Sequence, residues 1–260
     1  MTSVGMNYDR TENSHLMVPF LLEKAFRSLE DVRFIEPDSK EVPDLMVNSM
    51  PWNRIKRGVR TVYWELDIAE HNHSDDYRQF DTVYFPSNMY KEIWPEHGKF
   101  LPMAVDMEFF HPVDVAKTKD VVFMGRLDRS LRSKYLEKLG EKFEIEVGAR
   151  LRGIKTCEAL CAGKCSFQIS EFKNLEQRNF EYSAVLPMVL ERVPDLDVFE
   201  EDVHYKGFDR DNYPELEEKI AWCVNNPKAS TAMRDRMIQH LVENHTYQHR
   251  ARQLLDEIKV

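Results

Sequence analysis

Short apolar runs alternate with segments of helical spacing along most of the chain. The apolar runs predict strands at residues 3–6, 32–36, 45–48, 61–64, 82–85, 99–103, 121–124, 143–147, 166–169, 188–190 and 203–206. Apolar positions at helical period predict helices at residues 14–28, 131–139, 156–162, 216–225 and 245–260. Strands that alternate with helices are typical of parallel α/β architecture.

A polar, proline-containing stretch divides this pattern into two series. Phe110-His111-Pro112-Val113-Asp114 separates them, and each series opens with a strand. We therefore predict an N-terminal Rossmann-like domain at residues 1–112 and a second one at 113–260, with the linker at about 111–118. Two such halves facing a cleft would bind a ligand at the carboxyl ends of their strands. Ser14 and Thr246 are the expected N-caps of the first and last helices.

Composition narrows the functional classes. The chain has 260 residues, 42% of them hydrophobic, and a formal net charge of -9. Proteins that bind duplex DNA across a broad face usually carry a basic footprint, so the overall charge argues against that class. No apolar run approaches the roughly 18 residues of a membrane span, and the N-terminus lacks a signal-peptide pattern. We therefore expect a cytoplasmic protein.

The cysteines are better explained by burial than by metal binding. Cys157, Cys161 and Cys165 are spaced four apart, but no CxxC pair or nearby histidine completes a zinc set. Cys223 lies in an apolar helical pattern. Buried, reduced thiols are expected at these positions.

The segment Gln177–Ala184 carries the strongest candidate chemistry. Arg178 at an expected helix start suits a diphosphate, because helix N-termini attract anions. Glu181 can accept hydrogen bonds from both hydroxyls of a ribose, and Asn179 lies between these two residues. The alternative is structural: Glu181 as a helix-start residue that pairs with Arg178.

A second candidate phosphate contact follows the strand at 121–124. Gly125 lacks a Cβ, so the backbone there can approach a phosphate. Arg126 or Arg129 would then balance the charge of a leaving diphosphate. An ordinary strand-turn-helix with surface arginines is the alternative.

The N-terminal half offers candidates for the acceptor side. Glu65 and Asp67 follow a predicted strand and would orient an acceptor hydroxyl or act as general base, unless they only cap the next helix. Asn7 and Tyr8 follow the first strand, and His71 lies in the polar stretch after Asp67. All are expected at the cleft.

Four blocks of the chain together resemble the GT-B glycosyltransferases of the CgeB-like, glycosyl transferases group 1 family. They are Phe80–Phe85 with Phe100–Asp106, Val121–Arg126, Arg178–Ala184, and Asn226-Pro227 with His245–Arg250. The resemblance covers residues 80–258. Two departures stand out. Lys173 stands eight residues before Glu181, where related families carry a glutamate, and Val185-Leu186-Pro187 replaces the usual glycine.

The resemblance implies a hexosyltransferase-like, retaining enzyme. It implies a UDP- or GDP-sugar donor on the second domain, with the terminal helix 245–260 crossing back to the first. Glu65, Asp67 and Arg126 would be its catalytic residues. The acceptor hydroxyl would belong to a glycan, a small molecule, a protein or a modified DNA base. A viral-type DNA-base glycosyltransferase, a non-catalytic nucleotide-sugar-binding module and a sugar-nucleotide epimerase remain the alternatives.

The resemblance also bears on metal use. Asp195-Leu-Asp197 and Asp209-Arg-Asp211 have the DxD spacing that binds a divalent ion in the other large glycosyltransferase fold. DxD is a weak pattern in an acidic chain, and GT-B enzymes generally rely on helix dipoles and basic side chains instead. We therefore predict no essential metal and no cofactor besides the donor.

Overall fold

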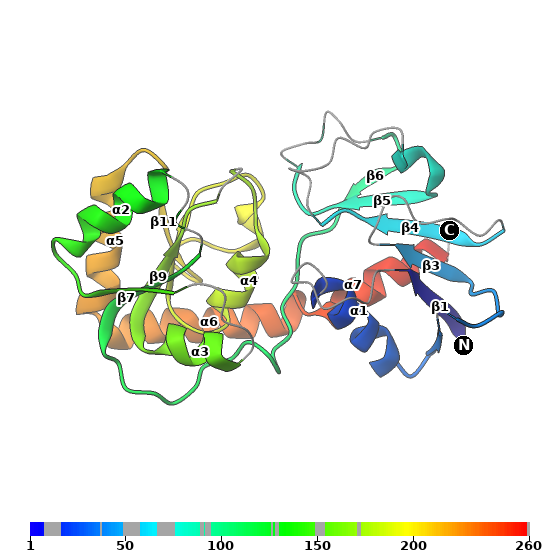
Figure 1. Cartoon of the computed structure of the whole chain (residues 1–260), viewed down its shortest axis with the longest axis horizontal. Coiled ribbons are helices and arrows are strands. Elements are labelled where there is room, and N and C mark those ends of the chain that lie inside the picture. Colours follow the sequence, from blue (N-terminus) through cyan, green and yellow to red (C-terminus); the bar gives the residue numbers. More distant parts are fainter. Residues whose placement is uncertain are drawn as a thin grey trace. The chain divides into compact units, whose positions relative to one another are not determined.

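Two structural units make up the protein. The computed structural model describes residues 1–7, 17–36, 38–48, 58–66, 76–88, 91, 95–125, 127, 130–148, 154–170 and 173–258. The N-terminal unit comprises Met1–Pro102 together with Thr246–Val260, and the C-terminal unit comprises Met103–His245. The end of the chain therefore belongs to the same unit as its beginning, as the red and blue helices α7 and α1 show in Figure 1.

This division falls earlier in the chain than the predicted boundary at 112/113. Residues just after Pro102 already contact elements of the C-terminal unit. The Gln177 side chain donates a hydrogen bond to the Ala104 carbonyl at 2.8 Å, and Cys157 Sγ lies 3.2 Å from the Phe109 carbonyl oxygen. The polar stretch with Pro112 lies inside an irregular segment that begins after Phe100, and these contacts decide the unit to which that segment belongs.

The N-terminal unit is built on a six-stranded parallel sheet with the order β2-β1-β3-β4-β5-β6. Its strands are β1 (Thr2–Asn7), β2 (Val32–Ile35), β3 (Leu45–Asn48), β4 (Arg60–Trp64), β5 (Thr82–Phe85) and β6 (Gly98–Phe100). β4 and β5 are buried along most of their length, as near-continuous apolar strands of parallel sheets usually are. The predicted strands of this half are present in the structure, except that the strand predicted at 99–103 ends at Phe100.

Helices from both ends of the chain pack together in this unit. Helix α1 (Met17–Ser28) contacts α7 (Tyr247–Leu255), and the short helices η2 (Asp76–Gln79) and η5 (Asp256–Ile258) complete the set among the described residues. Thr246 is the N-cap of α7, as predicted. The predicted helix 245–260 is shorter in the structure, where α7 gives way to a 3-10 turn. Ser14 lies outside the described residues.

Buried charges anchor the terminal segment. Arg250 is almost fully buried, and its Nε donates to the Pro102 carbonyl at 2.7 Å. Glu257 is 4% exposed and accepts hydrogen bonds from Lys99 Nζ at 2.6 Å and Thr82 Oγ1 at 2.8 Å. The Tyr84 hydroxyl donates to Oε1 of the same carboxylate, the oxygen that also accepts from Lys99. Burial alone would raise the pKa of Glu257, but these hydrogen bonds outweigh burial and lower the pKa to about 2.

We expect Glu257→Gln to lower the free energy of unfolding at pH 7 by about 2 kcal/mol, because hydrogen bonds to a charged group are lost. A carboxyl group with a depressed folded-state pKa contributes stability above its unfolded pKa, and this contribution disappears as pH falls towards 2. The difference from wild type should therefore shrink in urea titrations between pH 5 and pH 2.5. The exposed Glu30→Gln is the control, and a pH-independent difference would contradict the anchoring role.

The C-terminal unit has a five-stranded parallel sheet with the order β11-β10-β9-β7-β8. Its strands are β7 (Lys119–Met124), β8 (Ile145–Gly148), β9 (Gly163–Gln168), β10 (Met188–Glu191) and β11 (Lys206–Phe208). β11 begins where the predicted strand 203–206 ends. Asp202, with a φ of 66°, and the hydrogen bond from His204 N–H to the Glu200 carbonyl form a turn there instead.

Helices surround this second sheet (Figure 1). They are α2 (Ser130–Gly140), α3 (Ile154–Cys161), α4 (Gln177–Ser183), η4 (Leu196–Val198), α5 (Tyr213–Asn225) and α6 (Pro227–Asn244). Sequence reasoning missed α6, because its buried side is a narrow stripe of Ser230, Met233, Met237 and Leu241 in a polar segment. Pro227 at its first turn was the available signal.

Two further predictions concern the chain as a whole. All four cysteines are buried and form no disulfide, as expected. In the part of the chain that the structure describes, no helix has both the length and the apolar character needed to cross a bilayer.

Candidate active site

The strand order of the C-terminal unit defines where a ligand would bind. β9 and β8 lie on opposite sides of β7, so the connections after β7 and β9 leave the sheet in opposite directions. Ligands of open α/β sheets bind at the carboxyl ends of the strands at such a switch point. The residues that follow Met124 and Gln168 are therefore the candidate site.

Two of the predicted donor-binding residues meet there. A Cβ built onto Gly125 would lie 3.3 Å from Arg178 Nη1 and 3.1 Å from the Phe123 ring. The Gly125 N–H donates to the Gly148 carbonyl at 3.1 Å, which ties the ends of β7 and β8 together. Gly125 thus leaves room for the guanidinium of Arg178, a close approach that any larger residue would crowd.

Helix α4 carries the remaining residues of the motif. Glu176 is its N-cap, and the Glu176 N–H donates to Asn179 Oδ1 at 2.8 Å in a reciprocal capping box. Asn179 is 3% exposed, so its side chain serves the start of the helix. The end of α4 that we expected to attract phosphate therefore already has a protein carboxylate, and the guanidinium of Arg178 is the cation that this helix offers.

Glu181 lies one turn after Gln177 on α4. Gln177 Nε2 donates to Glu181 Oε1 at 3.1 Å and also to the Ala104 carbonyl. Burial raises the pKa of Glu181 to about 7, although the hydrogen bond from Gln177 and the charge of Arg178 both oppose the rise. A carboxylate so close to its titration point near neutral pH is typical of functional sites.

A hydroxyl group ties the same helix to the end of β7. The Tyr182 hydroxyl lies 3.4 Å from the Met124 carbonyl oxygen. Burial raises the pKa of Tyr182 to about 12, so the group stays protonated and able to donate. α4 is thereby held against the residue that precedes Gly125.

Buried ionic groups that the sequence did not identify hold the connection between β9 and α4. Arg132 of α2 is 4% exposed and donates through Nε and Nη2 to the Ile169 carbonyl, at 3.1 and 2.7 Å. Gln168 Nε2 donates to Glu176 Oε2 at 2.8 Å. An arginine in a polar segment is usually a surface residue, and only packing shows that Arg132 is internal.

A buried ion pair holds Ser170, which lies just after the end of β9. Glu191, at the end of β10, accepts a hydrogen bond from the Ser170 N–H at 2.9 Å. Arg210 binds Glu191 through Nε and, at 3.0 Å, through Nη2, and it also donates to the Ser170 carbonyl. The ends of β9, β10 and β11 are thus joined. A charged residue closing an apolar strand was the signal in the sequence.

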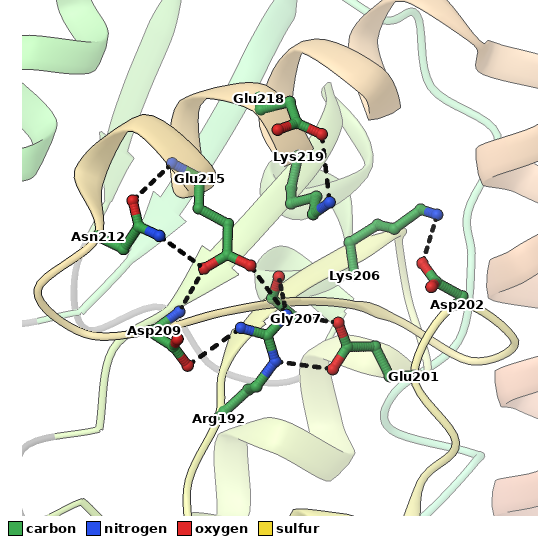
Figure 2. Close-up of polar contacts among 10 residues, drawn as sticks. All are labelled: Arg192, Glu201, Asp202, Lys206, Gly207, Asp209, Asn212, Glu215, Glu218 and Lys219. Carbon is green, nitrogen blue, oxygen red and sulfur yellow. Dashed lines mark hydrogen bonds and ion pairs between the residues drawn. The ribbon is translucent and has the colours of Figure 1, made fainter.

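Arg192, the residue after β10, forms a second network of ion pairs, as Figure 2 shows. Its guanidinium donates to both oxygens of Glu201 at 2.8 and 2.7 Å, to Asp209 Oδ1 at 3.0 Å and to Glu215 Oε1 at 2.9 Å. A Cβ at Gly207 would lie 2.4 Å from Glu201 Oε2, so glycine leaves room for this carboxylate.

The network also accounts for part of the DxD pattern. Asp209 is paired with Arg192, and Asp195 adopts a φ of 68° at the start of η4. Within the described residues, no group of three His, Cys, Asp or Glu side chains is arranged to hold a metal ion.

The N-terminal unit places Glu65 in a buried aromatic cluster. Glu65 directly follows β4 and is 2% exposed. Its Oε2 accepts hydrogen bonds from the hydroxyls of Tyr63 at 3.1 Å and Tyr77 at 2.7 Å. The Tyr63 ring stacks with both Tyr77 and Phe80 in the same cluster. Glu65 therefore has a structural role at this position, and its catalytic role stays a prediction.

Several predicted site residues are not located. Arg126, Arg129, Asp67, His71 and Tyr8 lie outside the described residues. Asn7 ends β1, in register with Asn48 of β3 at the carboxyl end of the N-terminal sheet. Its backbone position agrees with the expected edge of the sheet.

Comparisons with known proteins identify the family and the fold. The profile of a family described as glycosyl transferase-like matches residues 107–256. No curated protein matches the sequence. The structure of HepE from Anabaena with UDP and glucose has a TM-score of 0.69 at 10% identity, and the match covers 100% of both chains.

Two other solved structures share the fold. An alpha-glucosyltransferase in complex with UDP and a 13-mer DNA containing an HMU base has a TM-score of 0.69 at 11% identity, over 100% of both chains. TarM of S. aureus has a TM-score of 0.63 at 11% identity, over 83% of this chain and 55% of TarM. This chain therefore spans about half the length of TarM. The chain belongs to the glycosyl transferase-like family, and its two parallel α/β units are those of the GT-B fold.

Proposed function

We propose that the protein transfers a sugar from a nucleoside-diphosphate sugar to an acceptor hydroxyl, with the donor bound on the C-terminal unit. The observation that carries this is the guanidinium of Arg178 against Gly125 at the switch point, with Glu181 on the same helix. Arg178 would bind the diphosphate, and Glu181 would accept hydrogen bonds from both ribose hydroxyls.

The same cation would assist the reaction. Negative charge grows on the diphosphate as the glycosidic bond breaks, and a guanidinium already in place stabilises this charge more in the transition state than in the ground state. We propose that Arg126 and Arg129 contribute to this stabilisation and that no metal is essential. Retention of configuration is what the resemblance implies.

HepE and the alpha-glucosyltransferase were both solved with UDP, which favours UDP-sugars as the first donors to test. GDP-sugars are the alternative. The acceptor side is assigned to the N-terminal unit, with Asn7, Tyr8 and His71 as contacts. The hydroxyls of Tyr63 and Tyr77 already donate hydrogen bonds to Glu65. We therefore propose Asp67 as the base and Glu65 as a residue that positions the end of β4.

Donor binding should depend on the ionisation of Glu181. Its pKa of about 7 means that the carboxylate needed for the ribose is largely protonated at pH 6. We expect the Kd for UDP-glucose, measured by calorimetry, to rise about tenfold from pH 8 to pH 6. Glu181→Gln should weaken binding by about tenfold at pH 8 and remove this pH dependence.

The exposed Glu158→Gln on α3 is the matched control and should behave as wild type. A folded Glu181→Gln protein with wild-type affinity and wild-type pH dependence would remove Glu181 from the donor site. Failure of the wild-type protein to bind any UDP- or GDP-sugar would contradict the proposed function itself.

A modified DNA base is the second candidate acceptor. The alpha-glucosyltransferase that was solved with DNA matches the fold over the whole of this chain, which favours a DNA acceptor. The net charge of -9 opposes it. Transfer of glucose from UDP-glucose to DNA containing 5-hydroxymethyluracil, with affinity that falls steeply with salt, would support this acceptor. Conversion of the donor without an acceptor would indicate an epimerase, and tight binding without turnover a binding module.

A further inference from the structure

Lys173 has an unusual backbone for its residue type. Its φ is 56°, in the left-handed region that disfavours side chains with a Cβ. The other non-glycine residues with positive φ in the described chain are Asp195 and Asp202. Aspartate tolerates this region because its short side chain can hydrogen-bond locally, whereas lysine has no such compensation.

Buried polar groups hold the turn that contains Lys173. Asn174 N–H donates to Ser170 Oγ at 3.0 Å, and Ser170 Oγ lies 3.0 Å from Asn174 Oδ1. Ser170 is itself held through its backbone by Glu191 and Arg210. The strained conformation is therefore imposed by the surrounding structure, a condition under which strain persists mainly at functional positions.

The turn lies in the connection that positions the candidate site. It leaves the carboxyl end of β9, beside the switch point, and leads into α4 with Arg178 and Glu181. Lys173 is exposed, and no described residue forms a hydrogen bond or ion pair with it. A flexible cation that has no partner among the described residues and has a strained backbone is suited to a ligand's negative charge.

We infer that Lys173 is a donor-binding residue whose ammonium group binds an anionic group of the nucleotide sugar. This rests on the proposed function. Two parts of a donor carry this chemistry: the diphosphate, and the carboxylate of an acidic sugar such as a uronic acid. In both cases the cation replaces the glutamate that related families carry eight residues before Glu181, so this chain would differ from them in its donor contacts.

The first test compares Lys173→Met with wild type by calorimetry against UDP, UDP-glucose and UDP-glucuronate. If Lys173 binds the diphosphate, all three affinities should fall by about tenfold. If Lys173 binds a sugar carboxylate, only the affinity for UDP-glucuronate should fall, and wild type should bind UDP-glucuronate more tightly than UDP-glucose. Lys173→Arg should keep most of the affinity, because the charge remains. Lys228→Met, which removes another exposed lysine of the same unit, should change nothing.

The second test separates ligand binding from turn geometry. Lys173→Gly should raise the Tm, since glycine adopts the left-handed region without strain. The same variant should also lower the affinity for the nucleotide sugar, because the ammonium group is lost. A rise in Tm with unchanged affinity for every probe, together with unchanged affinity in Lys173→Met, would reduce Lys173 to an ordinary turn residue. If wild type binds the probes and both variants match it, this inference alone fails. If wild type binds none of the nucleotides, the proposed function fails with it.

Discussion

Replacing Arg178 with methionine is expected to lower kcat/KM for the nucleotide sugar by about 100- to 1000-fold. This is the range seen when an enzyme loses one hydrogen-bond donor that stabilises a developing negative charge. The expectation follows from the position of its guanidinium against Gly125, at the switch point of the sheet. Methionine keeps an unbranched apolar stem and removes the guanidinium, with its charge and its fork of N–H donors. Release of UDP from UDP-glucose, with or without acceptor, measures the effect.

Two further variants sharpen this result. Arg178→Lys should recover only part of the activity, because lysine provides charge without bidentate geometry. Gly125→Ala should cause an intermediate loss, since its Cβ would lie 3.3 Å from Nη1 and displace the guanidinium. Wild-type kinetics in a folded Arg178→Met protein would show that the diphosphate is bound elsewhere.

Replacing Arg210 with methionine is expected to have the largest effect on stability. Glu191 is 3% exposed, so the variant would leave a buried carboxylate without its cation. Removing one partner of a buried ion pair usually costs about 3–5 kcal/mol. Urea unfolding of the whole chain, followed by circular dichroism, should show this loss as a lower midpoint for the C-terminal unit.

The double variant Glu191→Leu with Arg210→Met tests the cause. Removing both charges should recover much of the lost stability, because the unpaired carboxylate is gone. Recovery should remain incomplete, since the Ser170 N–H then loses its acceptor. A double variant less stable than Arg210→Met would show that the pair contributes mainly through something other than charge compensation.

The sequence predicted most elements of the fold for a simple reason. Buried parallel strands are short apolar runs, and they remain visible without any knowledge of their neighbours. Helix α6 was missed because its buried stripe combines Ser230 and Met233 with polar neighbours, so its periodicity is weak. The end of the terminal helix was misjudged because Glu257 looks like an ordinary surface residue until Lys99 and Thr82 surround it.

The candidate site divides in the same way. By itself the sequence determined the alternation of strands and helices, the Arg178 and Glu181 motif, and the glycine after β7. Each of these is a pattern among residues that are close together in the sequence. Only the tertiary structure decided that Arg132 is internal and that the Tyr77 hydroxyl binds Glu65. It also decided that Glu191 and Arg210 meet. Such pairs lie at the ends of different strands, and the order of strands in a sheet is set by packing of the whole unit rather than by any local pattern.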